Sequence, residues 1–377
     1  MSGRGHRVDG GRPVRLLIAG GGTGGHVYPG LAVAEAVRQL CPAAEVRFCG
    51  TRRGLEATVV PAAGWRLHTV PASGMRGLGP IARGRFLANL VAGNVAALAL
   101  LLRWRPDAVL GTGGYASAPA LLAARSLGVP VALQEQNAVP GSANRLLGRF
   151  ATRIYLGTAA AAARFPGRDC LVTGNPVRAA FRAAPAGPAG ATGVLNVLMF
   201  GGSRGARTLN RAARELAVLW RGRDDVALLV QSGPAGRDEV AAAFAGWAPE
   251  RARVVAYIDD MASALAGADL VVCRAGAMTL AEMAVAGRPA VLVPFPHATD
   301  DHQWHNAQDM AVGGAAVVVR DETCDGATLA AIVSELGRDR PRLAAMARAS
   351  AARARPDAAR RIAIDLLRLA GRATPGA

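Results

Sequence analysis

The stretch Val14-Arg-Leu-Leu-Ile-Ala-Gly-Gly-Gly-Thr-Gly-Gly-His26 joins an apolar run to a glycine-rich turn, and helix-forming residues follow it near Leu31. A second stretch, Val194-Leu-Asn-Val-Leu-Met-Phe-Gly-Gly-Ser-Arg-Gly-Ala-Arg207, repeats this order. A short apolar strand that leads through glycines into a helix is the building block of a parallel α/β layer. The duplication therefore predicts an α/β fold with two Rossmann-like domains that face each other.

The apolar runs do not alternate cleanly with polar residues, which is typical of parallel strands that are buried on both faces. After the first run they lie at residues 108–110, 129–133, 194–200, 227–230, 270–273 and 290–293. The Pro/Gly/Ala-rich segment 183–193 is interpreted as the connection between the two domains. From Pro356 the chain starts a last helix that extends to about Leu369.

The expected organisation is a tail followed by two domains. Residues 1–12 are rich in glycine and arginine, and they predict a flexible tail and not a signal peptide, because they lack an apolar stretch. The N-terminal domain is expected at residues 13–177 and the C-terminal domain at 178–356. A final packed helix is expected at residues 357–371.

The composition excludes several classes of protein. Of the 377 residues, 51% are hydrophobic and 19% are charged, which supports a sizeable core and argues against intrinsic disorder. The formal net charge is +17, and every basic side chain except histidine is an arginine. Without lysine there is neither a P-loop lysine nor a pyridoxal-phosphate Schiff base. The charge predicts attraction to polyanions, namely nucleic acid, anionic lipid or a phosphorylated substrate; a GC-rich genome is the alternative explanation.

Two further counts narrow the possible partners. The five cysteines are scattered without a C-x-x-C pair, so they indicate a reducing compartment and suggest neither a zinc knuckle nor a disulfide framework. Aromatic residues make up only 5% of the chain, too few for a base-stacking surface. We therefore expect no nucleic-acid partner.

Both glycine loops can bind a diphosphate, because glycine lets backbone N–H groups approach phosphate oxygens at the start of a helix. Gly20, Gly22 and Gly25 also satisfy the dinucleotide fingerprint G-x-G-x-x-G. The acidic residue that would hold a ribose is expected after the second strand, but Thr51-Arg52-Arg53 stands there. Arg52 and Arg53 could accept a 2′-phosphate, so an NADP oxidoreductase stays open as an alternative.

The loops at the ends of the other strands supply candidate polar groups. His26 could act as a general base toward a hydroxyl, or it could only donate hydrogen bonds at the start of its helix. Gly111-Thr-Gly-Gly-Tyr-Ala-Ser-Ala-Pro119 and Gln134-Glu-Gln-Asn137 also follow strands. Glu135 and Asn137 could bind sugar hydroxyls or could cap a turn.

The second half offers a further anion site and a polar loop. Arg274-Ala-Gly-Ala-Met-Thr-Leu-Ala-Glu282 follows a strand, and its Glu282 could receive ribose hydroxyls or cap the helix. In the segment 294–306, His302 and His305 share a helix face after two aspartates. This pattern fits either a metal site or a polar loop that binds sugar.

Eight co-linear motifs together resemble the MurG family, the N-acetylglucosaminyltransferases of bacterial peptidoglycan synthesis. They are Gly20–Ala34, Gly113-Gly-Tyr115, Gln134-Glu-Gln-Asn137, Thr173-Gly-Asn-Pro-Val-Arg178, Gly201–Arg207, Ile258-Asp-Asp-Met261, Cys273–Glu282 and His302-Gln-Trp-His-Asn-Ala307. The resemblance implies a GT-B fold with a deep cleft between the domains. It also implies that GlcNAc moves with inversion from UDP-GlcNAc to the 4-hydroxyl of MurNAc in lipid I, giving lipid II, without a metal ion or cofactor.

The resemblance also implies the roles of individual residues. His26 and Glu135 are the catalytic candidates, with Tyr115 nearby in the cleft. Ile258 lies by the uracil, Glu282 holds the ribose and Gln303 faces the sugar. The residues expected along the nucleotide and diphosphate are Ser203, Ala277, Met278, Thr279, Leu280 and Ala281. The remaining donor-contacting positions are Thr23, Gly24, Gly25, Asn137 and Arg178.

Two positions depart from the family pattern. Arg204 stands where glutamine is common, and Met278 replaces a usual leucine. Arg204 adds a charge close to the expected phosphates, which could change the affinity for the donor. In the family the final helix crosses back onto the N-terminal domain, so we assign residues after Pro356 to that domain.

A lipid-linked acceptor requires contact with a membrane, and residues 75–90 are the best candidate for it. Arginines surround apolar residues between Met75 and Arg105, which favours binding to an anionic surface. For Val91–Leu102 we expect a core helix, and the apolar stretch 87–102 is too short to cross a bilayer comfortably. The expected location is peripheral, at the cytoplasmic face of the bacterial cell membrane.

Alternatives remain for the protein partners and for the class of reaction. Other cell-wall synthesis proteins stay open as partners. A UDP-GlcNAc epimerase of the same fold is the alternative enzyme, because it shares the donor and the two-domain layout but needs no lipid acceptor.

Overall fold

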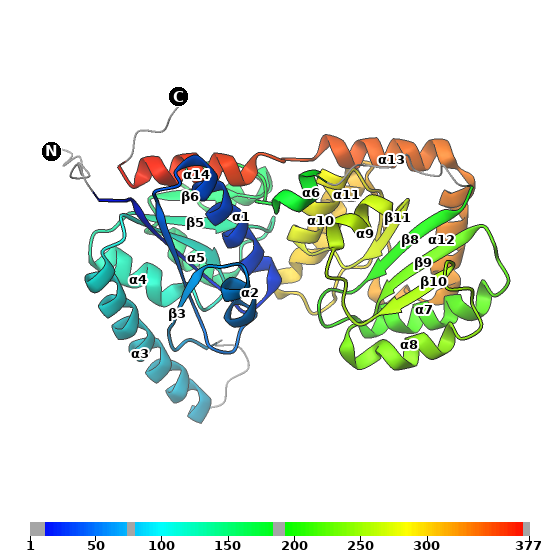
Figure 1. Cartoon of the computed structure of the whole chain (residues 1–377), viewed down its shortest axis with the longest axis horizontal. Helices are drawn as coiled ribbons and strands as arrows, with labels where there is room; N and C mark the ends of the chain where they lie inside the picture. The colour runs from blue at the N-terminus through cyan, green and yellow to red at the C-terminus, as the bar shows by residue number, and fades with distance from the viewer. Residues whose placement is uncertain (1–11, 74–79, 184–192, 372–377) are drawn as a thin grey trace. The chain divides into compact units, whose positions relative to one another are not determined.

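The computed structural model describes residues 12–73, 80–183 and 193–371. The chain divides into an N-terminal unit, Met1–Arg178 with Pro356–Ala377, and a C-terminal unit, Ala179–Arg355 (Figure 1). The expectation placed this division one residue earlier. Of the predicted tail only Arg12 is described, and most of the predicted connection 183–193 lies outside the described residues.

The N-terminal unit is built on a parallel sheet of seven strands in the order β3-β2-β1-β4-β5-β6-β7. The strands are β1 (Arg15–Gly20), β2 (Glu45–Gly50), β3 (Arg66–Thr69), β4 (Ala108–Gly113), β5 (Val131–Glu135), β6 (Arg153–Leu156) and β7 (Cys170–Val172). The central strands β4 and β5 are buried along their whole length, because helices cover both faces of the sheet.

The helices of this unit form two layers, one on each face of the sheet (Figure 1). They are α1 (Gly24–Leu40), α2 (Glu56–Ala62), α3 (Pro80–Trp104), α4 (Ala118–Ser126), α5 (Ser142–Gly148), α14 (Ala358–Leu369) and the 3-10 helix η1 (Ala159–Arg164). Helix α14 packs beside α1, and Asp365 accepts a hydrogen bond of 3.0 Å from the Tyr155 hydroxyl and pairs with Arg153. The last helix therefore belongs to the N-terminal unit.

The C-terminal unit has a parallel sheet of six strands in the order β10-β9-β8-β11-β12-β13. Its strands are β8 (Leu195–Phe200), β9 (Val226–Gln231), β10 (Ala252–Val255), β11 (Leu270–Cys273), β12 (Ala290–Leu292) and β13 (Ala316–Val318). Its α-helices are α6 (Ala179–Ala183), α7 (Arg207–Leu219), α8 (Arg237–Ala243), α9 (Met261–Gly267), α10 (Ala277–Ala286), α11 (His302–Val312), α12 (Gly326–Arg338) and α13 (Arg340–Ala352). Its 3-10 helices are η2 (Pro234–Gly236), η3 (Thr299–Asp301) and η4 (Asp321–Thr323). The predicted pair of Rossmann-like parallel sheets is confirmed.

Helix α3 corrects two expectations about the apolar stretch 87–102. Because the helix has 25 residues, its segment Phe86–Trp104 is long and apolar enough to cross a membrane by length and composition alone. The stretch is also not a buried core helix. Val91, Val95 and Leu102 are 62%, 63% and 53% exposed, whereas Ala97 and Leu101 on the opposite side pack into the core. One face of α3 holds the unit together, and the other is an exposed apolar surface.

Candidate functional site

The order of strands reverses once in each sheet, and the predicted site loops lie beside these reversals. In the N-terminal unit the reversal lies between β1 and β4, and in the C-terminal unit between β8 and β11. Ligands of open α/β sheets bind at the carboxyl ends of the strands at such a switch point. The first glycine loop and the loop at Gly113 follow β1 and β4, and the second glycine loop and Arg274 follow β8 and β11.

His26 lies in the first turn of α1, between the loops that follow β1 and β4. Its Nδ1 is 3.3 Å from the Gly21 carbonyl oxygen and 3.4 Å from the Thr23 hydroxyl. The imidazole also lies against Gly113, where an added Cβ would come within 2.8 Å of the ring, and Gly113 has φ of +103°. Only glycine suits that position, so the loop after β4 leaves space for the imidazole ring.

The first glycine loop has a partner that its sequence motif does not reveal. The Gly22 N–H donates to Glu56 Oε2 at 2.8 Å, and Glu56 is only 1% exposed. The dinucleotide pattern expects an acidic residue at the end of β2, where Thr51-Arg52-Arg53 stands. The carboxylate of Glu56 instead enters from the start of α2. One N–H of the loop is therefore engaged by an internal carboxylate.

Glu135 is buried at the end of β5, with 1% exposure, and its carboxylate is bound by its own loop. It accepts hydrogen bonds from the Asn137 N–H and side chain at 2.8 and 3.2 Å, and from Asn144 at 2.8 Å. Burial raises the pKa of Glu135, although hydrogen bonds from Asn137, Asn144 and the Gly141 N–H act in the opposite direction. This geometry fits a residue that shapes the Asn137 loop, and a catalytic role for Glu135 stays a prediction.

The other predicted residues of the N-terminal unit lie at the same edge of the sheet. Tyr115, after β4, is 39% exposed. Arg178, after β7, places its guanidinium 4.4 Å from the centre of the Tyr28 ring on α1. Thr23, Gly24 and Gly25 form the start of α1 itself. The fold thus brings together residues from four separate motifs of the sequence.

In the C-terminal unit, Gln231 connects the second glycine loop to the segment of Ile258. Its side-chain amide donates to the Gly202 carbonyl oxygen at 2.9 Å and accepts from the Ile258 N–H at 2.8 Å. Ser203 is exposed beside this contact, and Tyr257 is 46% exposed next to Ile258. Sequence reasoning missed Gln231 and Tyr257, although a polar residue at the end of the apolar run 226–231 was a usable signal.

The start of α10 presents only part of the predicted set. Ala277, Thr279, Ala281 and Glu282 are partly exposed. Met278 and Leu280 are 8% and 7% exposed and face the core. Only the main chain of these two residues could meet a ligand, because their side chains pack inside.

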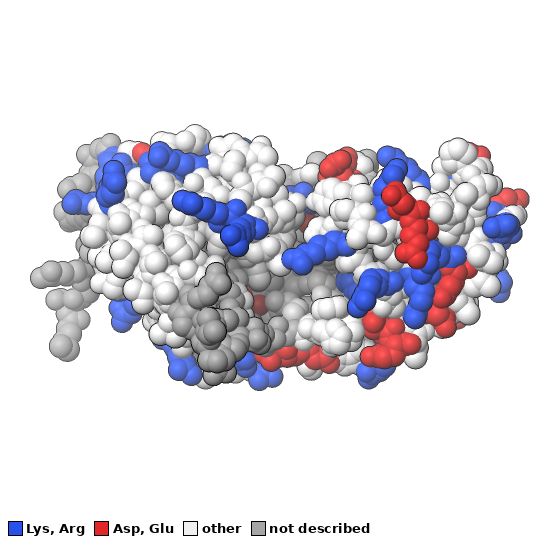
Figure 2. Space-filling view, turned by 90° about the horizontal axis from the view of Figure 1, so that it is seen from below, with Lys and Arg blue, Asp and Glu red and all other residues white. Residues whose placement is uncertain are grey.

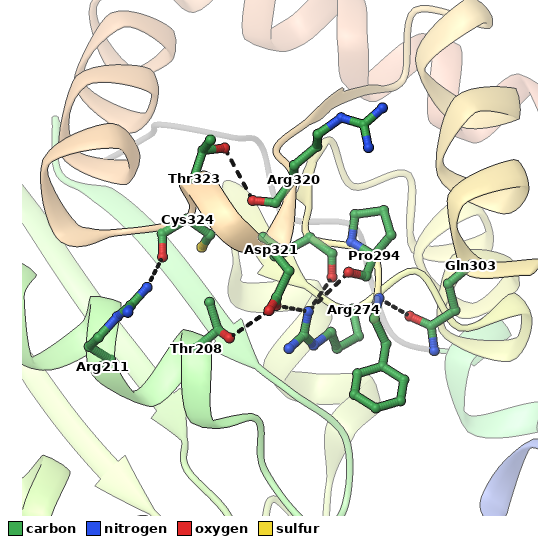
Figure 3. Close-up of polar contacts among 11 residues, drawn as sticks. Thr208, Arg211, Arg274, Pro294, Gln303, Arg320, Asp321, Thr323 and Cys324 are labelled. Carbon is green, nitrogen blue, oxygen red and sulfur yellow. Dashed lines mark hydrogen bonds and ion pairs between the residues drawn. The ribbon is translucent and has the colours of Figure 1, made fainter. Parts of the chain in front are cut away.

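Arg274 is the centre of a polar network in the C-terminal unit (Figure 3). Its guanidinium donates to the carbonyl oxygens of Val293 and Pro294, each at 3.1 Å, and to Asp321 at 2.5 Å. The second Asp321 oxygen accepts from the Thr208 hydroxyl at 3.0 Å. The network therefore connects the end of β11, the end of β12, η4 and α7.

Gln303, the residue expected to face the sugar, lies next to this network. Its Oε1 accepts from the Phe295 N–H at 3.0 Å (Figure 3). Asp300 and Asp301 precede it with φ of +51° and +52°, a conformation that costs non-glycine residues energy and is common at functional sites. Among the residues that the structure describes, no group of three or more His, Cys, Asp or Glu side chains could hold a metal ion.

Two parallel α/β units, each with polar loops at its switch point, have the architecture of a GT-B glycosyltransferase. Residues 16–156 match the glycosyltransferase family 28 N-terminal domain, and residues 196–362 match its C-terminal domain. The chain belongs to glycosyltransferase family 28. The resemblance inferred from the motifs is confirmed.

Individual relatives agree over nearly the whole chain. A Geobacter sulfurreducens protein is 41% identical over 94% of this chain and 98% of its own length, and it is named UDP-N-acetylglucosamine–N-acetylmuramyl-(pentapeptide) pyrophosphoryl-undecaprenol N-acetylglucosamine transferase. The crystal structure of Acinetobacter baumannii MurG has a TM-score of 0.74 and 32% identity, covering 94% of this chain and all of that one. A putative UDP-N-acetylglucosamine 2-epimerase from Listeria monocytogenes has a TM-score of 0.69 but only 17% identity over 97% and 99% of the two chains, a likeness of fold alone.

Proposed function

We propose that the chain transfers GlcNAc from UDP-GlcNAc to the 4-hydroxyl of MurNAc in lipid I, giving lipid II and UDP. The observation that carries this function is an identity of 41–44%, over nearly the whole chain, to transferases that act in this reaction by name. The epimerase alternative is weaker, because the chain resembles the putative epimerase in fold alone.

The donor is assigned to the C-terminal unit. The exposed Ser203 follows β8, and α10 follows the paired strand β11. At the start of α10 main-chain N–H groups and the helix dipole favour a diphosphate. The Ile258 segment would receive the uracil, next to the partly exposed ring of Tyr257. Glu282 would hold the ribose and Gln303 the sugar.

The acceptor chemistry is assigned to His26 in the N-terminal unit. In an inverting displacement the attacking hydroxyl loses a proton while negative charge grows on the departing UDP. Nδ1 of His26 contacts the Gly21 carbonyl oxygen and the Thr23 hydroxyl, and we assign the transferred proton to Nε2. Residues of the C-terminal unit that bind diphosphate would stabilise the leaving group.

Contact with an anionic membrane is assigned to the N-terminal unit, and the distribution of charge supports this. The unit has 25 arginines against 9 aspartates and glutamates, a net charge of +16, whereas the C-terminal unit has 19 against 18, a net charge of +1. On the face in Figure 2, acidic side chains gather mainly among the arginines of the C-terminal unit. A genome-wide preference for arginine does not explain such an asymmetry within one chain.

The apolar face of α3 extends the predicted membrane patch. Residues 75–79 of that patch lie outside the described residues, but Leu87 within it is 61% exposed. Val91 and Val95 continue the same helix face at four-residue spacing. We infer that this face lies in the lipid interface at the cytoplasmic side of the membrane, with Arg103 at its far end.

Replacing Leu87, Val91 and Val95 together with serine is expected to weaken binding to vesicles of phosphatidylcholine and phosphatidylglycerol by more than about tenfold, because three apolar side chains leave the lipid interface. Vesicle sedimentation measures this change. Val218→Ser is the matched control, because Val218 is 66% exposed on the C-terminal unit.

The arginines of the patch and of the end of α3 have their own variant, in which Arg76, Arg83, Arg85, Arg103 and Arg105 become glutamine. It is expected to lose the preference for phosphatidylglycerol, because each arginine contributes about 1 kcal/mol near an anionic surface. Unchanged sedimentation of both variants would refute the membrane assignment.

The reaction is tested by UDP release from UDP-GlcNAc with EDTA present, with and without a soluble lipid I analogue. Release that depends on the acceptor, with a β-linked disaccharide product, is expected. Release without acceptor would indicate an epimerase or hydrolase. No release under either condition, once donor binding is verified, would exclude the transferase.

A further inference from the structure

Glu56 is a buried carboxylate that the proposed chemistry does not yet use. Its Oε2 accepts from the Gly22 N–H at 2.8 Å, and its Oε1 accepts from the Thr51 N–H at 2.8 Å and the Thr51 hydroxyl at 2.7 Å. All three donors are neutral groups. The side chain therefore connects the loop after β1 with the loop after β2 through hydrogen bonds alone.

Three glycines enclose this carboxylate. A Cβ added at Gly21, Gly50 or Gly54 would lie 2.2, 2.6 or 2.1 Å from the nearest Glu56 side-chain atom. No side chain larger than hydrogen fits at these positions while the carboxylate is in place. The loops after β1 and β2 are thus shaped around Glu56. A glutamate that only began helix α2 would not require three glycines packed against its carboxylate.

One peptide unit joins Glu56 to His26. The Gly22 N–H, which donates to Glu56, and the Gly21 carbonyl oxygen, which lies 3.3 Å from His26 Nδ1, belong to the same planar peptide group. A carboxylate on the N–H side fixes the plane of this group and strengthens its carbonyl oxygen as an acceptor. A stronger acceptor there favours the imidazole tautomer with the hydrogen on Nδ1, which leaves Nε2 free of hydrogen.

We propose that Glu56 is a positioning residue for His26, acting through the Gly21–Gly22 peptide. The carboxylate orients this peptide, the peptide holds the imidazole by Nδ1, and Nε2 is then directed to take the proton of the acceptor hydroxyl. This inference rests on the proposed function, in which His26 is the base.

Glu56→Gln is the first test. The amide can accept at one end only, so its NH₂ group must face a donor at the other end. We expect kcat to fall about 10- to 100-fold, as for one unsatisfied buried contact. The KM for UDP-GlcNAc should change less than about threefold, because the uracil, ribose and diphosphate of the donor are assigned to the C-terminal unit.

Thr51→Val is the matched control. It removes the hydroxyl bond to Oε1 but keeps the Gly22 contact with Oε2. It should lower Tm to a similar degree while kcat stays within about threefold of the parent. If Glu56→Gln does not fold, Glu56→Asp retains the charge on a shorter side chain that cannot reach both loops, and the same loss of kcat is expected.

The double variant separates positioning from mere stability. In a His26→Gln background, adding Glu56→Gln should reduce kcat by less than about threefold, because the residue it positions is already gone. Independent, multiplicative losses would overturn the inference, as would a folded Glu56→Gln enzyme with parental kcat. If His26→Gln alone has parental kcat, the proposed base itself is wrong, which is a different result.

Discussion

His26→Gln is expected to lower kcat by about 10²- to 10⁴-fold while the Kd for UDP-GlcNAc stays within about twofold. Glutamine is similar in size and can still donate to the Gly21 carbonyl oxygen, but it cannot take a proton from the acceptor hydroxyl. Its effect should therefore fall on the chemical step and not on donor binding. Single-turnover rates with a soluble lipid I analogue, together with calorimetric titration of UDP-GlcNAc, measure the two quantities separately.

His68→Gln is the matched control for this variant. His68 lies on β3 in the same unit, away from the β1/β4 switch point. Burial and the nearby Arg47 and Arg66 lower its pKa. Because it lies on the edge strand β3, away from the switch point, His68 has no part in the proposed proton transfer. A His26→Gln enzyme whose kcat lies within threefold of the His68→Gln enzyme would remove His26 from the mechanism.

The second large effect is expected at Asp321. Its side chain is 18% exposed and pairs with Arg274, which is 11% exposed. Asp321→Ala leaves the Arg274 guanidinium without its carboxylate in a mostly buried position. We expect the free energy of unfolding to fall by about 3 kcal/mol. Denaturant unfolding of the purified chain measures this loss.

The same variant should also weaken donor binding. Arg274 donates to the carbonyl oxygens of Val293 and Pro294. The next N–H along the chain, that of Phe295, donates to Gln303. A loosened segment there would misplace Gln303, so the KM for UDP-GlcNAc should rise about tenfold. The rise in KM would distinguish a role in the site from a role in stability alone.

Two further variants set the scale for Asp321→Ala. Asp238→Ala removes a carboxylate that is 93% exposed and paired with Arg237, and it should change the unfolding free energy by less than about 0.5 kcal/mol. Thr208→Val removes one hydrogen bond to Asp321 and keeps the ion pair, so a loss of about 1 kcal/mol is expected. Equal stability of the Asp321→Ala and Asp238→Ala enzymes would contradict the importance of the network.

Much of the fold was predictable because buried parallel strands are apolar along their whole length. All seven apolar runs, from Val14 to Val293, became strands of the two sheets. The strands β3, β6, β7, β10 and β13 were not singled out. They have only three or four residues each, and β3 and β10 form sheet edges where polar residues such as Arg66 and Arg253 are tolerated.

The candidate site was predictable as a set of loops but not as a set of contacts. Glycines after a strand mark places where the backbone must adopt positive φ or approach a partner closely, and Gly22, Gly113 and Gly202 do so. The exposed face of α3 beyond residue 90 was missed, because periodicity alone does not tell which side of an apolar helix the core covers. Val91 and Val95 show that only one side is covered.

The sequence by itself determined the class of fold, the two glycine loops and the family, because these depend on local patterns and on motifs in a fixed order. Only the tertiary structure decided which polar groups meet. Glu56 reaches the loop of Gly22 across 34 residues, and Arg274 reaches Asp321 across 47. Such pairs form because parallel strands bring the loops at their carboxyl ends together, and no local pattern records which distant side chain fills the space between them.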